Sequence, residues 1–395
     1  MNARYQRTIY ACFTGYIVQA IINNFVPLLF LTFESTYHIP LSKITILITF
    51  NFGIQLLVDL LSTGFVDKIG YRASIMIAHI FAAAGLLGLA VLPELLPSAY
   101  AGLLISVTVY ALGGGLLEVL VSPIVESCPT DNKEKAMSLL HSFYCWGHVG
   151  VVLFSTLFFK LFGIENWKIL TCIWLIVPAV NTFIFAKTPI APLVEEGEKG
   201  MSMLDLCKTR VFWILMLMMT CAGASEQAVS QWASTFAERG LGVSKTVGDL
   251  AGPMAFAILM GSARAFYGKF GDRISLDKFM VGSGLLCVLS YLCISLSPSP
   301  VMSLTGCAVC GLSVGIMWPG SFSKASATLR NGGTALFALL ALAGDLGCSG
   351  GPTLVGYVSS MASDDLKKGI LAAIIFPVLL VTGIFWLRKP KDIRK

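Results

Sequence analysis

Four carboxylates interrupt the long apolar segments of the sequence. Glu118, Glu226 and Asp345 lie near the middle of such segments, and Asp59 lies nearer the end of one. A charged side chain at the centre of a bilayer costs about 2.5–3.5 kcal/mol on insertion scales. No Lys or Arg lies deep in any segment, and Arg264 comes nearest, one turn from a segment end. We therefore expect Glu118, Glu226 and Asp345 to take up a proton or a metal cation, as a cation-coupled carrier requires.

Uncharged polar side chains form a second pattern in the same segments. Many recur three or four residues apart, which places them on one face of a helix. Amide and hydroxyl groups donate and accept hydrogen bonds without requiring a counter-charge, which suits a polyhydroxylated solute. Aromatic rings could stack on a sugar, although packing or anchoring at the membrane interface is the alternative for each tryptophan. The candidate solute-binding residues are Gln19, Asn23, Asn24, Asn51, Gln55, His141, Tyr144, Gln227, Gln231, Trp232 and Trp318.

The composition is that of a membrane protein. The chain has 395 residues, of which 56% are hydrophobic and 13% charged, and its mean hydropathy is +0.79. A soluble chain carries about 25% charged residues, so a disordered protein, a nucleic-acid-binding arm and an ordinary cytosolic enzyme are excluded. A membrane-spanning helix needs about 20 apolar residues. Twelve segments meet this need, at 9–33, 43–66, 74–93, 99–125, 136–162, 168–187, 211–237, 248–268, 277–297, 301–324, 332–360 and 368–388.

Basic residues are distributed unequally between the connections of these twelve segments. When the segments are taken to cross the membrane alternately, about three quarters of the 28 Lys and Arg residues fall on one side. That side also holds both termini, and the positive-inside rule places it in the cytoplasm. We therefore expect a multi-pass protein of the plasma membrane with both termini cytoplasmic.

The two halves of the sequence repeat one another. Gln19-Ala20 in the first segment is matched by Gln227-Ala228 in the seventh. Further matches in the same order pair Asp67-Lys68 with Asp272-Arg273, Gly115-Leu116 with Gly311-Leu312, and Gly147-His148 with Gly344-Asp345. A parallel repeat of six helices indicates a transporter architecture. We expect an N-terminal six-helix bundle at 1–187, a cytoplasmic linker at 188–210 and a C-terminal six-helix bundle at 211–395.

The connection after the second segment carries a motif. The segment Asp67–Arg72 resembles the loop between the second and third helices of the major facilitator superfamily, and Gly268–Arg273 resembles its counterpart in the second half. The resemblance implies an all-α membrane fold of twelve transmembrane helices in two parallel-repeated six-helix bundles. Asp59, two turns before the first motif, is expected to pair at the same cytoplasmic gate. The candidate gating residues are Asp59, Asp67, Arg72, Asp272 and Arg273.

A narrower resemblance lies in the first, fourth and fifth segments. The stretches Gly115–Pro123 and His141–Gly147, together with the pair Asn23-Asn24, resemble the fucose permease branch of the superfamily. In that branch the acidic residue matching Glu118 and the polar residue matching Tyr144 serve proton and sugar. Pro27 stands where that branch has an acidic residue after the Asn pair.

Other function classes lack their residues in this chain. No phosphate-binding loop, catalytic constellation or deep basic clamp for an anion is present, and the 11 cysteines are mostly within apolar segments. We expect no enzyme activity, cofactor, metal or nucleic acid partner. The first hypothesis is proton- or sodium-coupled uptake of a neutral sugar-like solute by a monomer in the lipid bilayer. Proton-driven efflux of drugs or lipophilic metabolites is the alternative, and a non-transporting receptor is an alternative of another class.

Overall fold

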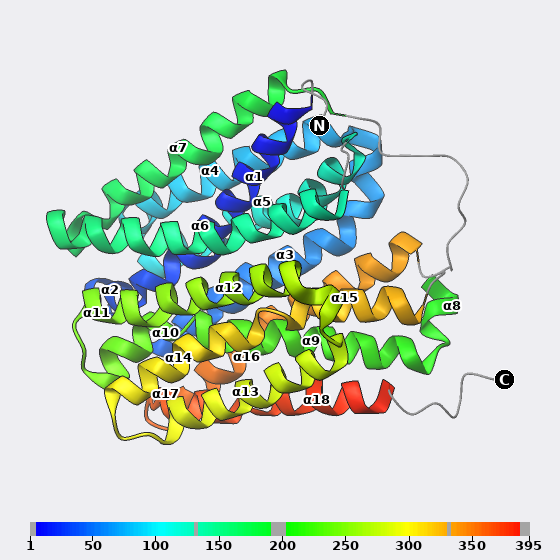
Figure 1. The fold of residues 1–395 in the computed structure, drawn as a ribbon. Coiled ribbons are helices and arrows are strands. Elements are labelled where there is room, and N and C mark those ends of the chain that lie inside the picture. Colours follow the sequence, from blue (N-terminus) through cyan, green and yellow to red (C-terminus); the bar gives the residue numbers. More distant parts are fainter. Residues whose placement is uncertain (1–4, 130–132, 191–202, 330–332, 388–395) are drawn as a thin grey trace. The chain divides into compact units, whose positions relative to one another are not determined.

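The computed structural model describes residues 5–129, 133–190, 203–329 and 333–387, and every regular element among them is a helix. By their internal contacts these residues form two units (Figure 1). Unit 1 comprises residues up to Glu195 together with Ser244–Leu250, and unit 2 comprises Glu196–Val243 and the chain from Ala251 onward. Unit 1 thus includes a short segment from the second half of the chain.

The helices of unit 1 up to Lys187 follow one another with short connections, and a further helix joins them from the second half of the chain. They are α1 (Gln6–Asn24), η1 (Val26–Leu29), α2 (Phe30–Tyr37), α3 (Leu41–Ile69), α4 (Tyr71–Leu95), α5 (Ala99–Ser127), α6 (Lys133–Phe162), η2 (Ile164–Asn166), α7 (Trp167–Lys187) and α11 (Lys245–Asp249).

Unit 2 has the same number of long segments, but more of them are divided. Its elements are α8 (Met203–Cys207), α9 (Arg210–Ser230), α10 (Ala233–Thr235), η3 (Phe236–Gly240), η4 (Leu250–Met254, which begins in unit 1), α12 (Ala255–Phe270), η5 (Gly271–Arg273), α13 (Leu276–Leu296), α14 (Pro300–Val314), α15 (Met317–Thr328), α16 (Gly333–Met361), α17 (Leu366–Ala372) and α18 (Ile375–Leu387).

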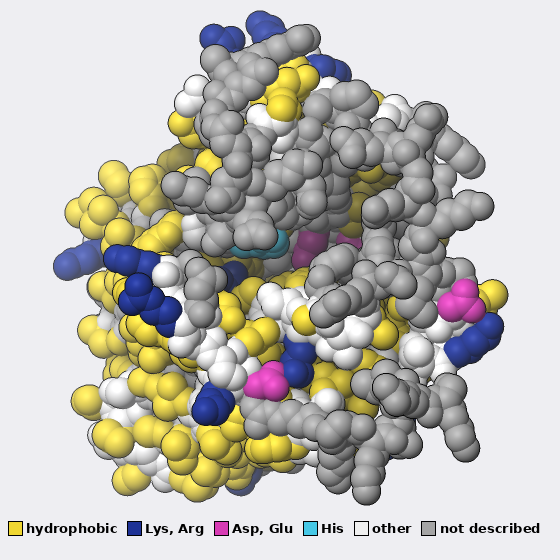
Figure 2. All heavy atoms as spheres, turned by 45° about the vertical axis from the view of Figure 1, so that its right-hand side comes forward, with side chains coloured by type: hydrophobic (Ala, Val, Ile, Leu, Met, Phe, Trp, Pro, Cys, Tyr) yellow, Lys and Arg dark blue, Asp and Glu magenta, His cyan; other side chains and the backbone are white. Residues whose placement is uncertain are grey.

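The twelve predicted segments match these helices. Within the described residues, eleven helical segments are long and apolar enough to cross a membrane. The remaining predicted segment, 332–360, corresponds to α16, whose first residues adjoin a part of the chain outside the described ranges. Large apolar side chains such as Phe183 and Val301 are 72% exposed on helix surfaces, and hydrophobic atoms cover much of the described surface in Figure 2. Such a surface is suited to contact with lipid chains.

Interrupted helices are a feature that hydropathy did not predict. In the first span α1 ends at Asn24 and a 3₁₀ turn follows, with Pro27 as its second residue. Proline has no N–H, so Pro27 removes the donor that would otherwise bond the carbonyl of Asn23 four residues earlier. The seventh span is interrupted after Ser230 and the tenth after Val314. The interruptions in the first and seventh spans adjoin the polar residues Asn23, Asn24 and Gln231.

Glycines allow the closest helix contacts in each unit. In unit 1, a Cβ on Gly113 of α5 would lie 2.5 Å from the carbonyl oxygen of Ala78 of α4. In unit 2, a Cβ on Gly351 of α16 would lie 2.5 Å from the carbonyl oxygen of Ala224 of α9. Real Cβ atoms do not approach this closely, so these crossings require residues without a side chain. They hold α5 and α16, which carry Glu118 and Asp345, at fixed positions.

Candidate functional site

A network of amide side chains lies inside unit 1. Gln19 Nε2 of α1 donates to Gln55 Oε1 of α3 over 2.8 Å. Gln55 Nε2 donates in turn to Asn23 Oδ1 at 2.9 Å and to Asn51 Oδ1 at 3.1 Å. Asn51 Nδ2 closes the group by donating to Asn23 Oδ1 over 3.1 Å. The four side chains that sequence spacing assigned to common helix faces are thus in direct contact.

Glu118 joins this network through Gln19. Its Oε2 accepts from Gln19 Nε2 over 3.3 Å, so one amide nitrogen is shared between the carboxylate and Gln55. The amide residues are 1–5% exposed, whereas Glu118 is half-buried. Tyr16 and Ser122, one turn away along α1 and α5, are hydrogen-bonded through their hydroxyls at 2.9 Å. We refer to Gln19, Asn23, Asn51, Gln55 and Glu118 as the amide network.

One acceptor of the amide network has no donor. Gln19 Oε1 is buried and makes no hydrogen bond to any atom that the structure describes. It lies beside Gly114 of α5, where a Cβ would come within 3.3 Å of it and within 3.1 Å of the Gln55 amide. Of the three consecutive glycines 113–115, Gly113 allows the close contact with α4, and Gly114 provides the space beside the amide network. A buried polar atom without a partner is rare and calls for a hydrogen-bond donor such as water or a bound molecule.

The other predicted residues of unit 1 are near the network but not part of it. Asn24 Nδ2 donates to the Ala20 carbonyl at 2.9 Å and lies 3.4 Å from the Tyr144 hydroxyl of α6. The exposed His141 ring stands 5.3 Å from the Tyr16 ring. His79 on α4 bonds the Ile75 carbonyl and Asn181 of α7.

Unit 2 contains a second polar cluster, and here one expectation was wrong. Glu226 was expected to have no base nearby, yet Arg264 Nη2 lies 3.2 Å from its Oε2. Sequence position put Arg264 near the end of its span, but the long arginine side chain extends to α9 from α12. Arg264 Nε also donates to the Gly315 carbonyl at 3.2 Å, where the tenth span is interrupted.

The amides of unit 2 continue from this ion pair along α9. Gln227 Nε2 donates to Glu226 Oε1 over 3.3 Å, and Gln231 Nε2 donates to Gln227 Oε1 over 3.0 Å. All three side chains are buried. The hydrogen bonds join Glu226 and the two glutamines into one cluster.

The two candidate tryptophans have different surroundings. Trp232 is fully buried, and its indole Nε1 donates to the Pro352 carbonyl over 3.0 Å. Trp318 is partly buried against the apolar cluster that includes Phe212 and Leu215, with Phe322 at a ring distance of 6.3 Å. Its ring also covers Gly344, leaving no room for a Cβ there. In this conformation both rings are in packed positions.

The remaining candidates are spread over both units. Asp345 is 3% exposed within α16, and Asp59 is half-buried on α3. Arg72 Nη1 donates to the carbonyls of Phe185 and Ala186 at 2.9 Å each, at the end of α7. Arg273 is exposed. The side chains of Asp67 and Asp272, and residues 191–202 of the predicted linker, lie outside the described part of the chain.

Sequence reasoning missed one buried charge. Asp249 of α11 has no exposed surface, and its Oδ2 lies 3.1 Å from Lys245 Nζ and 3.2 Å from Thr156 Oγ1 of α6. Lys245 also donates to the Leu28 carbonyl at 2.7 Å and lies over the Phe159 ring at 5.7 Å. A Lys–Asp pair spaced four residues apart is a signal in the sequence. The pair stands at the edge of an apolar segment, where charged residues are common and do not by themselves indicate burial.

Comparisons with known proteins agree with this architecture. A family model described as Major Facilitator Superfamily matches residues 11–352. No curated protein matches the sequence. Among solved structures, the D-xylose-proton symporter has a TM-score of 0.76 at 12% identity, with 98% of each chain covered.

Two further solved structures give the same result. The fucose:proton symporter of E. coli, solved as a single-site variant, has a TM-score of 0.67 at 15% identity, covering 97% of this chain and 99% of that one. A bacterial homologue of the human lysosomal transporter Spinster, inward-facing and occupied, has a TM-score of 0.75 at 14% identity, covering 98% and 97%. At such identities the likeness establishes the fold.

Proposed function

Since the chain belongs to the Major Facilitator Superfamily, we propose that this membrane transporter couples the uptake of a neutral polar solute, such as a sugar, to the movement of a proton. The solute is carried by alternating access, in which the binding residues face first one side of the membrane and then the other. The amide network of unit 1 supplies solute contacts, and Glu118 carries the proton.

The observation that carries this proposal is the free acceptor on Gln19. Gln19 Oε1 is buried without a donor among the described residues, beside the gap left by Gly114. A hydroxyl group of a solute can donate to this oxygen and accept from a neighbouring amide. The network holds no cation, and its one acid already accepts from Gln19. An uncharged molecule rich in hydroxyl groups therefore fits it better than an anion does.

Coupling to a proton follows from the shared nitrogen of Gln19. An N–H group bonds a carboxylate more strongly than it bonds a neutral acid. Protonation of Glu118 weakens the 3.3 Å bond from Gln19 Nε2 and leaves that nitrogen to Gln55 at 2.8 Å. The protonated carboxyl can also donate to the solute. Proton and solute then favour the same arrangement of Gln19, which is the condition for coupling two ligands.

We assign a different role to the acid of unit 2. Arg264 lies 3.2 Å from Glu226 and supplies a counter-charge, so the proposal does not assign the coupled proton to Glu226. In this proposal Gln227 and Gln231 are solute ligands of unit 2, and the ion pair positions them through the 3.3 Å bond from Gln227 to Glu226.

The test is uptake of radiolabelled hexoses and pentoses by the purified protein in proteoliposomes. We expect at least one sugar to accumulate under an inward proton gradient and not without it. A sodium gradient in place of the proton gradient identifies sodium coupling. If no sugar enters and lipophilic compounds leave instead, the efflux alternative replaces this proposal.

A substitution at Gly114 links such transport to the amide network. Gly114→Ala places a methyl group 3.3 Å from Gln19 Oε1, which narrows the space for a solute hydroxyl. Overpacking of this kind costs about 1–3 kcal/mol, and we expect the solute KM to rise about ten-fold. The matched control is Gly150→Ala on α6, where a Cβ meets no atom within 4 Å. Equal KM values for Gly114→Ala and Gly150→Ala would show that the free acceptor on Gln19 does not contribute to solute binding.

A further inference from the structure

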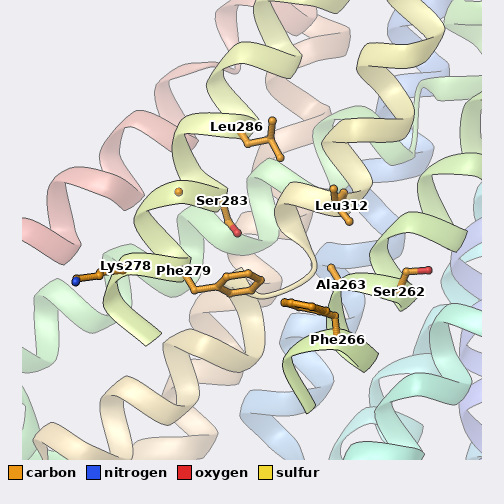
Figure 3. A pocket seen from close by; sticks show the side chains of 9 residues that line it. Ser262, Ala263, Phe266, Lys278, Phe279, Ser283, Leu286 and Leu312 are labelled. Carbon is orange, nitrogen blue, oxygen red and sulfur yellow. The ribbon is translucent and has the colours of Figure 1, made fainter. Parts of the chain in front are cut away.

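A groove of about 610 Å³ lies on unit 2 between α12, α13 and α14 (Figure 3). Its walls are mostly apolar, with Phe266 from α12, Phe279 and Leu286 from α13, and Leu312 from α14. Phe266 is 46% exposed and Leu312 is 37% exposed. A volume of this size is in the range of small-molecule sites, about 300–1,000 Å³.

The groove faces away from the polar cluster of its unit. Arg264 points toward Glu226 and the Gly315 carbonyl. Phe266 follows two residues later on the same helix, so its side chain leaves α12 about 200° around the axis. The groove is therefore separate from the proposed solute ligands, and on a membrane-spanning unit its exposed apolar walls meet lipid.

Basic residues lie at and near the end of the groove where α12 connects to α13. Lys278 lines it, and its ammonium group points outward from the aromatic rings in Figure 3. Lys278 is exposed and forms no ion pair with any side chain that the structure describes. The neighbouring acid, Asp277, is instead paired with Lys324 of α15. Lys269 at the end of α12 and Arg273 of η5 are exposed as well. This end of the groove is thus positive.

Polarity decreases in order along α13. Lys278 comes first, Ser283 follows about 7.5 Å farther along the helix axis, and Leu286 lies beyond it. The Ser283 hydroxyl points into the groove and has no hydrogen-bond partner among the described residues (Figure 3). Gly282 beside it leaves open space, because a Cβ there would meet no atom within 4 Å.

We propose that this groove is a binding site for one anionic phospholipid. The phosphate lies at Lys278, an ester carbonyl accepts from Ser283 Oγ, and an acyl chain occupies the space over Gly282 between Phe266 and Leu312. The sequence of cation, hydroxyl and apolar wall matches the order of these groups in a phospholipid. Basic pockets between membrane helices bind anionic lipid headgroups in this way.

Native mass spectrometry of the purified full-length protein tests the site. The protein is released from detergent with added phosphatidylglycerol or phosphatidylcholine of identical acyl chains. We expect the wild type to retain one phosphatidylglycerol at concentrations where phosphatidylcholine is lost. Lys278→Gln should weaken phosphatidylglycerol binding about five-fold, the effect of one lysine at an anionic surface, and leave phosphatidylcholine binding unchanged.

A second variant tests the acyl-chain part of the groove. Gly282→Trp fills the open space with an indole ring and should abolish retention of either lipid. Gly150→Trp is the matched control, since its Cβ also meets no atom within 4 Å, and it should bind as the wild type does. Elution as a single peak from a sizing column verifies that each variant is folded. Equal retention of the two lipids by the wild type, or normal retention by Gly282→Trp, would overturn the proposal.

Discussion

Gln19 is the residue on which the proposed coupling depends, because one nitrogen bonds both Gln55 and Glu118. Glu118→Gln keeps the size of the side chain and fixes it in an uncharged state. We expect this variant to lose gradient-driven accumulation and to retain exchange of labelled for unlabelled solute across the vesicle membrane. Both rates are measured in the same proteoliposomes.

The control for Glu118→Gln is the same substitution at an exposed acid. Glu165 of η2 is exposed, and Glu165→Gln should accumulate solute as the wild type does. Accumulation by Glu118→Gln at the wild-type rate would show that the proton is carried elsewhere. Asp345, which is 3% exposed, would then be the next acid to examine.

Glu226 and Arg264 provide a second test at the scale of single residues. Their side chains are 9% and 16% exposed, so loss of one partner leaves a largely buried charge. Breaking a buried pair costs about 3–5 kcal/mol. We expect Arg264→Met to lower the free energy of unfolding in detergent by about this amount. The double variant with Glu226→Gln should recover most of the loss, and a double variant as unstable as the single one would contradict a direct interaction.

The sequence could predict the members of the amide network but not all of their partners. Gln19 and Asn23 on one helix, and Asn51 and Gln55 on another, are spaced by one turn, and periodicity alone places each pair on a common face. The Glu226–Arg264 pair joins two helices whose approach depends on packing. No spacing in the sequence records that approach, so the acid was expected to lack a base.

At the scale of elements, α11 shows how a short segment can be held by charge. Lys245 and Asp249 attach it to the Leu28 carbonyl and to Thr156 within unit 1. Asp249→Asn removes the negative partner of Lys245 and should increase hydrogen–deuterium exchange across residues 244–250. Exchange in α4, which is remote from this pair in the chain, should stay unchanged.

An exposed Lys–Asp pair offers the comparison for that experiment. Lys208 and Asp205 are 76% and 54% exposed, and exposed pairs contribute little to stability. Asp205→Asn should therefore leave local exchange within error of the wild type. Equal changes for the two substitutions would mean that burial of Asp249 does not stabilise α11.

Helix positions followed from the sequence more directly than helix interruptions did. Apolar length gave each span to within a few residues, because about 20 apolar residues are required to cross the bilayer. The 3₁₀ turn at Val26–Leu29 has a local signal in Pro27. The division after Ser230 has no proline beside it, and the bond from Trp232 to the Pro352 carbonyl at this point joins residues that are far apart in the sequence.

At the scale of the whole molecule, the distribution of basic residues predicts which side of the membrane each terminus occupies. Cys207, the last residue of α8, is exposed and lies on the predicted cytoplasmic side. A membrane-impermeant maleimide should label it in inside-out vesicles and not in intact cells, as measured by mass spectrometry.

Cys128, at the end of α5 on the same predicted side, is the internal control. Burial raises the pKa of its thiol to about 11, so it stays protonated and inaccessible at pH 7. It should remain unlabelled in both preparations, and labelling of Cys207 in intact cells would reverse the predicted orientation.

The ion pair inside unit 2 also bears on how the proposed coupling would respond to voltage. Glu226 and Arg264 carry opposite charges at 3.2 Å, so together they contribute no net charge to the interior. The protein's own charges return to their starting positions over a complete cycle, so in the proposed mechanism the charge moved is that of the proton carried with a neutral solute. The paired charges of unit 2 add none to the step in which the carrier reorients, and the proposed transport is electrogenic. A membrane potential of 100 mV supplies about 2.3 kcal/mol to that charge. In the proposed mechanism the cell's electrical potential alone can therefore concentrate the solute, even where the pH is equal on both sides.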